Sequence, residues 1–176
     1  MEVLQLHIVI TNRNYTVKEI VQKLEHKFPS AAKLLIEAKD TGFADLEELG
    51  IPNDYTEMYK LVGGETEDSD GVFGLNRMLT LKESKDGIVN DAEDLQYYSK
   101  GISASVFVPI FQSPGRQQLG YAKFDDGWVF SEYDLGVSYW EQTTLGEYLS
   151  WFENKLDSDG FFEDEQFKGL IDKDDL

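Results

Sequence analysis

The residues that most often carry out catalysis are absent, few or poorly placed in this sequence. Its 176 residues contain no cysteine and only two histidines, so disulfides, Cys-ligated zinc, iron–sulfur clusters and a cysteine nucleophile are excluded. His7 lies in an apolar stretch and His26 on an expected helix, and both are better interpreted as structural or surface residues than as catalytic bases. No serine has the setting of a nucleophile elbow, and there is no Walker lysine loop or dinucleotide fingerprint. We therefore expect a protein that is not an enzyme and that has no cofactor.

Two stretches, 68–71 and 157–160, have the sequence Asp-Ser-Asp-Gly, which also occurs in calcium-binding loops. When either is aligned on its glycine, the position of the closing bidentate glutamate holds Arg77 or Gln166. A loop without that carboxylate lacks much of the charge that binds calcium. Because Asp-x-Asp-Gly is also a common turn sequence, we expect turns and no metal site.

Paired carboxylates are frequent, and a glycosidase-like acid and base pair is an alternative that such pairs leave open. Among 34 acidic residues, however, adjacent pairs are expected by chance. Asp125-Asp126 precedes a glycine and is better interpreted as a hairpin turn than as a catalytic dyad. The aromatic residues Tyr97-Tyr98, Trp128, Phe130 and Tyr133 either line a ligand groove or are divided between the core and the sheet surface.

Net charge is the most pronounced feature of the composition. The chain carries 16 basic and 34 acidic residues, a net charge of −18. Residues 121–176 alone hold 15 acids and 4 bases, a net of −11. Such a surface repels nucleic acid and anionic lipid and accelerates encounter with basic proteins. The alternative is that the charge only keeps the protein soluble.

The length fits one domain. Residues 3–10 are apolar but interrupted by polar residues and lack a basic leader, and no run approaches the ~20 apolar residues of a membrane span. We therefore expect a cytoplasmic protein. The predicted organisation is an N-terminal extension or edge strand over residues 1–15, one domain over 16–156, and an acidic C-terminal tail over 157–176, either frayed or docked as a short helix.

Helices are expected mainly in the first half of the chain. Thr16 and Glu19 form a capping-box pattern before an apolar helical face that ends at Pro29. Further helices are expected over 30–38, over 44–49, from Asn53 or Asp54 to Val62, and over 88–100. Between them, residues 65–71 read as a surface loop and 72–75 as a short strand.

The second half changes to a strand pattern. Residues 106–111, 119–124 and 128–133 are rich in strand formers, with Pro109 predicting an edge or a bulge. A final helix is expected after the capping box of Thr144 and Glu147 and extends to Leu156. This order predicts an α+β fold in which an antiparallel meander packs against several helices.

The ordered set of these segments resembles the SUKH superfamily, which includes a fungal cell-wall synthesis regulator and many bacterial proteins. The resemblance begins with Leu49-Gly50-Ile51-Pro52-Asn53-Asp54-Tyr55, which is similar to the Leu-Gly-x-Pro step and helix start of that group. It continues through 71–75 and 78–79, through the strand segments 108–111, 119–121 and 128–130, and through the helix 145–156. It covers roughly residues 46–156.

The resemblance implies a bacterial immunity protein that binds the toxic domain of a polymorphic toxin, commonly a nuclease, in the cytoplasm of the producing cell. It implies no catalytic residues. A regulatory or scaffold module, as in the fungal relatives, is the alternative. Because a nuclease presents a basic surface, exposed acidic residues are the expected contacts; solvated loop charges are the alternative interpretation of each. The predicted partner-binding residues are Glu65, Glu67, Asp68, Asp70, Asp125, Asp126, Glu132 and Asp134.

Overall fold

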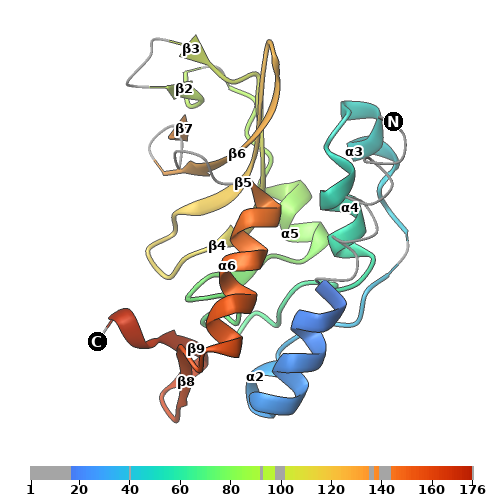
Figure 1. Ribbon diagram of the computed structural model, residues 1–176. Helices are drawn as coiled ribbons and strands as arrows, with labels where there is room; N and C mark the ends of the chain where they lie inside the picture. The colour runs from blue at the N-terminus through green and yellow to red at the C-terminus, as the bar shows by residue number, and fades with distance from the viewer. Residues whose placement is uncertain are drawn as a thin grey trace, which may run out of the picture.

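The computed structural model describes residues 17–39, 41–91, 93–97, 102–134, 137–138 and 144–175. Its centre is an antiparallel sheet (Figure 1), whose five strands have the order β1-β4-β5-β6-β7. The predicted α+β class is confirmed. The strands of this sheet are β1 Arg77–Met78, β4 Val106–Gln112, β5 Gln118–Phe124, β6 Gly127–Tyr133 and β7 Val137–Ser138.

Strands β4, β5 and β6 form the predicted meander, and two local features fix their register. The pairing of β4 with β5 shifts between Pro109 and Phe111, because proline has no N–H with which to continue the ladder. The predicted bulge is therefore confirmed. Opposite the bulge, a Cβ on Gly120 would lie 2.1 Å from the Val108 carbonyl oxygen, so only glycine fits there. At the other end of β5, the turn at Asp125-Asp126 leads into Gly127 at φ +135°.

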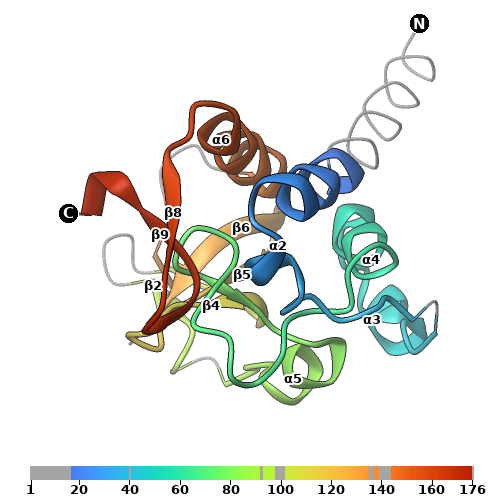
Figure 2. The ribbon, with the colours of Figure 1, turned by 90° about the horizontal axis from the view of Figure 1, so that it is seen from below.

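Helices cover one face of the sheet (Figure 1). Residues 17–27 are helical, and three ion pairs join this helix to α6 Leu145–Asp157 and the turn after it: Lys23–Glu153, Lys23–Asp157 and Lys27–Asp159. Seen from below, the helix over residues 17–27 lies beside α6 (Figure 2). The main core lies between these helices and the sheet face that bears Tyr121 and Phe130. The remaining helices are α2 Pro29–Ala32, α3 Ala44–Leu49, α4 Asn53–Tyr59, α5 Leu81–Asp86 and α6 Leu145–Asp157.

The opposite face of the sheet is also covered. Phe107, Ala122 and Phe124 pack there against Leu95 and Ala104 in a second, smaller core. The segment that carries Leu95 leads into a two-stranded sheet of β2 Gln96–Tyr97 and β3 Ile102–Ser103. Burial on both faces explains why β4 is a nearly continuous apolar run instead of an alternating one.

The prediction of an acidic tail over 157–176 is wrong. Helix α6 ends at Asp157 and is followed by an antiparallel hairpin, β8 Phe161–Asp164 and β9 Phe167–Asp172, and a short 3-10 helix, η1 Lys173–Asp175. Phe161 and Leu170 are buried in the main core. The acidic residues Glu163, Asp164 and Glu165 lie exposed around the turn of this hairpin, which made the segment resemble a solvated tail.

Three further predicted elements differ from the structure. Residues 30–38 form only the short α2, because the backbone at Leu34 and Ile36 pairs instead with residues 63–66. Within 88–100, Val89 bridges Phe107 and Gln96–Tyr97 is a strand, so no helix spans the described residues there. Residues 72–75 form a turn, not a strand. The predicted extension over 1–15 and the capping residue Thr16 lie outside the described residues.

Candidate functional site

The eight acidic residues predicted to bind a partner fall in three places. Glu67, Asp68 and Asp70 lie exposed in the loop that precedes β1. Asp125 and Asp126 lie exposed in the turn between β5 and β6. Glu132 is half-buried near the end of β6, and Asp134 is exposed just beyond it.

The prediction that Glu65 contacts a partner is wrong, because this residue is 0% exposed. The sequence around it is polar and rich in turn residues, which predicted a surface loop throughout. Its side chain instead points inward, and the hydrogen bonds described below explain how a carboxyl group is accommodated there.

The register of the sheet places these acids at two opposite ends. Met78 pairs with Phe111, Phe111 with Leu119 and Leu119 with Glu132, so Glu132 lies in the same row of the sheet as β1. Asp126 is six residues from Glu132 along β6, a separation of roughly 20 Å at ~3.3 Å per residue. The eight predicted residues therefore do not form one patch.

The acidic loop is bound to the C-terminal hairpin through Lys168. The Asp70 N–H donates to the Lys168 carbonyl oxygen at 2.7 Å, and the Lys168 N–H donates to Asp70 Oδ2 at 2.9 Å. Lys168 Nζ pairs with Asp68 at 2.7 Å, and this hydrogen bond lowers the pKa of Asp68. Glu67 makes no hydrogen bond or ion pair with the described residues. The structure thus joins the loop to a segment that the sequence assigned to a separate tail.

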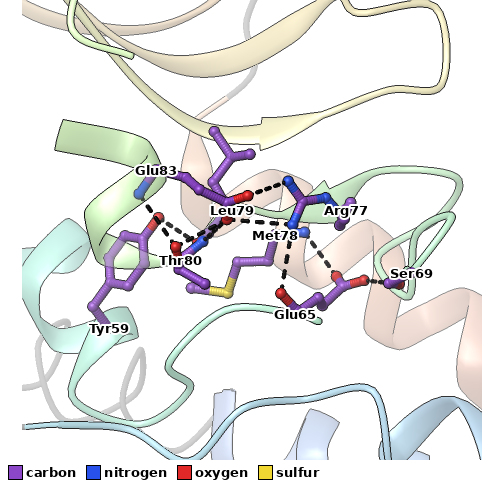
Figure 3. A network of polar contacts seen from close by, with 8 residues as sticks. All are labelled: Tyr59, Glu65, Ser69, Arg77, Met78, Leu79, Thr80 and Glu83. Atoms are coloured by element: carbon purple, nitrogen blue, oxygen red, sulfur yellow. Dashed lines mark hydrogen bonds and ion pairs between the residues drawn. The ribbon is translucent and has the colours of Figure 1, made fainter. Parts of the chain in front are cut away.

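Glu65 joins the two ends of this loop to β1 (Figure 3). Its Oε1 accepts a hydrogen bond from the Met78 N–H at 2.7 Å. Its Oε2 accepts from the Val72 N–H at 3.0 Å and from the Ser69 hydroxyl at 2.5 Å. All three partners of the carboxyl group are donors, which favours the ionised form.

Burial of the carboxyl group has the opposite effect on its pKa. Removal from water raises the pKa of Glu65 from its usual 4.5 to about 7, although the hydrogen bonds from Met78, Ser69 and Val72 and the charge of Arg77 lower it. When the carboxyl group is protonated, its O–H can donate only to the Ser69 hydroxyl oxygen, because the other two partners are backbone N–H groups and cannot accept. The Ser69 hydroxyl lies 3.4 Å from the Lys168 carbonyl oxygen and can then donate to it. Glu65 is therefore a buried structural group without access to a substrate.

Beside Glu65, Arg77 links the loop to the start of α5 (Figure 3). Its guanidinium donates to the Glu65 carbonyl oxygen at 3.4 Å and pairs with Glu83 at 2.7 Å. Glu83 also closes the capping box of α5 by accepting from the Thr80 N–H at 2.8 Å. Burial raises the pKa of Glu83, but Arg77 and Thr80 outweigh it, so the pKa is lowered. The loop, β1 and α5 are thus held as one unit.

The calcium-like sequences form structural contacts. Asp68 and Asp70 bind Lys168, whereas Asp157 and Asp159 pair with Lys23 and Lys27. Among the residues that the structure describes, no group of three or more histidine or carboxylate side chains is placed to hold a metal ion. In the same part of the chain, no helix combines the length and apolar character that crossing a bilayer requires.

The predicted aromatic residues are divided between the two faces of the sheet. Phe130 packs edge-on to Tyr121 in the main core, with ring centroids 5.8 Å apart, and the half-buried Trp128 packs against the same ring. Tyr133 stacks on Phe107 of the second core at 5.1 Å. Phe130 is therefore buried in the core, as one of the two alternatives predicted, whereas Trp128 and Tyr133 are half-buried against the two cores. Tyr98 and His7 lie outside the described residues.

No protein-family model matches the sequence, and a search of curated proteins finds no significant relative.

Proposed function

We propose that this chain is an immunity protein that binds and neutralises a bacterial toxin domain by protein–protein interaction. The observation that carries the proposal is the surplus of exposed acids without a cationic partner. Glu67, Asp125 and Asp126 form no ion pair within the described residues, and the net charge is −18. A basic protein such as a nuclease domain is the complementary partner. The resemblance to the SUKH superfamily supports the same proposal.

The mechanism we propose is occlusion of the toxin's basic surface without chemistry. No cofactor takes part, and no residue of this chain is assigned a catalytic role. The acids steer the encounter over a distance set by the Debye length, about 8 Å at physiological salt, so the association rate falls as salt rises. We further propose that this occurs in the cytoplasm of the producing cell.

A pull-down of the tagged full chain tests the proposal, using its own cells and the toxin domain encoded beside it. We expect one-to-one capture of the toxin domain with loss of its toxicity. Capture of housekeeping proteins without the toxin domain would contradict the proposal and favour the regulatory or scaffold alternative. Turnover of a substrate, abolished by Asp125→Asn or Asp126→Asn, would contradict the non-enzymatic part.

A further inference from the structure

A groove of about 350 Å³ lies between α2 and the β8–β9 hairpin. It combines apolar lining from Ala31, Leu34 and Phe167 with backbone from Gly169. Leu34 and Phe167 are half-buried, so part of each side chain remains accessible. The groove is thus large enough for one long side chain and offers it an apolar contact surface.

Three carboxylates line the same groove: Glu163, Asp164 and Glu165. Glu163 Oε1 accepts from the Ala31 N–H at 2.9 Å, and Asp164 Oδ1 accepts from the Gln166 N–H at 2.8 Å. Glu165 makes no hydrogen bond with the described residues. None of the three has an ion-pair partner there.

A lysine that lines the groove is already paired with another acid. Among the described residues that line the groove, Lys168 is the only basic one, and its Nζ pairs with Asp68. The carboxylates of the groove therefore remain available to form an ion pair with a cation of a partner.

Backbone contacts fix the walls of the groove. The Leu170 N–H donates to the Gly71 carbonyl oxygen at 2.9 Å, and the Thr66 N–H donates to the Leu34 carbonyl oxygen at 2.9 Å. Gly169 approaches Gly71 so closely that a Cβ would lie 2.1 Å from the Gly71 carbonyl oxygen. A groove held in this way needs little ordering when it binds.

We propose that this groove binds an arginine side chain of a basic protein partner. The methylene groups of arginine would pack on Ala31 and Leu34, and the planar guanidinium would stack on the Phe167 ring. The carboxylates of Glu163 and Glu165 supply the charge and the planar acceptor geometry that favour guanidinium over ammonium. This inference rests on the proposed function for the identity of the partner, but the arginine chemistry can be tested without it.

The first test uses the full chain and the peptide acetyl-Gly-Arg-Gly-amide, followed by amide NMR shifts. A ligand this small is expected to bind with a Kd on the order of 1 mM. We expect saturable shifts at Ala31, Leu34 and Gly169, and binding at least about fivefold weaker for the neutral citrulline peptide, since loss of one charge-assisted contact removes about 1 kcal/mol or more. Equal binding of both peptides, or shifts centred on Asp125 to Gly127, would overturn the proposal.

Matched variants complete the test. Glu163→Gln with Glu165→Gln retains an amide oxygen for the Ala31 N–H and is expected to weaken arginine-peptide binding at least about fivefold. Glu47→Gln with Glu48→Gln removes the same charge from exposed positions of α3, outside the groove, and is expected to change it less than about twofold. Equal effects of the two pairs would mean unspecific attraction and would reject the groove.

The two proposals can fail separately. If the toxin domain is captured one-to-one but its affinity is unchanged by Glu163→Gln with Glu165→Gln, the groove assignment is wrong and the proposed function stands. If the arginine peptide binds in the groove but no toxin domain is captured, the groove stands and the proposed function is wrong.

Discussion

The replacement Glu65→Gln separates the two opposing effects on this buried carboxyl group. A glutamine amide has only one acceptor oxygen. That oxygen can accept either from Val72 and Ser69 or from Met78, but not from both sets of donors. The amide NH2 group then faces a backbone N–H donor. In one orientation this donor is the Met78 N–H, whose nitrogen lies 2.7 Å from Glu65 Oε1 in the native protein. An unsatisfied buried donor costs about 1–3 kcal/mol, so two opposed donors should destabilise the variant by about 2–6 kcal/mol relative to the native protein with Glu65 protonated.

The difference in the free energy of unfolding between the native protein and Glu65→Gln, called the gap below, should depend on pH. The pKa of Glu65 is raised from 4.5 to about 7 in the folded protein. The group therefore contributes stability that is fully present below pH 4.5 and is lost as pH rises through about 7. At 1.36 kcal/mol per unit of pKa, the loss amounts to about 3 kcal/mol. Glutamine does not titrate, so we expect the gap between native and variant to shrink by about 2–3 kcal/mol from pH 5 to pH 8.

Urea unfolding of both proteins at pH 5, 6, 7 and 8 measures the gap directly, and subtraction cancels the titration of every other acid. Glu67→Gln is the matched control, since this neighbour is exposed and forms no hydrogen bond or ion pair with the described residues. A gap that stays constant or grows with pH would refute the reasoning. It would mean that the three donors outweigh burial and keep Glu65 ionised in the folded state.

Three further substitutions test the contacts that hold the rest of the fold. Gly169→Ala should lower the free energy of unfolding by more than about 1 kcal/mol and expose the hairpin to protease, because its Cβ meets the Gly71 carbonyl oxygen at 2.1 Å; Gly115→Ala, with only Ser113 Oγ 3.7 Å away, should be nearly neutral. Phe161→Ala should cost about 3–5 kcal/mol in chemical unfolding, whereas the half-buried Phe162→Ala should cost clearly less; equal losses would contradict the packing of β8. Thr144→Ala removes the cap of α6 and should lower stability by about 1 kcal/mol in thermal unfolding, and Ser158→Ala at the other end of α6 should have the smaller effect.

The elements that the sequence predicted well are those whose signals are local. The capping box of Thr144 and Glu147 starts α6 as expected, and the bulge lies at Pro109. Both depend on side chains within a few residues of each other, so spacing along the chain is enough to identify them.

The elements that it predicted wrongly depend on partners far along the chain. Leu34 pairs with Thr66 and Val89 with Phe107, and these contacts override the helical pattern around each residue. The hairpin after Asp157 depends on Gly169 meeting Gly71, almost one hundred positions earlier. A single sequence contains no signal for such pairings.

The candidate contact residues show the same division. Glu67 and Asp125 are exposed as expected, because turn residues reliably lie at the surface. Glu65 has the same local surroundings as Glu67 but is buried, since its acceptors are needed by Met78 and Val72 once β1 is in place. The groove acids were overlooked because their hairpin was assigned to a tail.

The most direct test of the central claim is the association rate of the full chain with the purified toxin domain encoded beside it, followed by stopped-flow fluorescence from low to high salt. We expect a one-to-one complex whose association rate constant falls at least about tenfold as the Debye length shortens from about 30 Å at 0.01 M to about 3 Å at 1 M. The absence of a complex at every salt concentration would contradict it, and binding at a rate independent of salt would contradict the role assigned to the acidic surface.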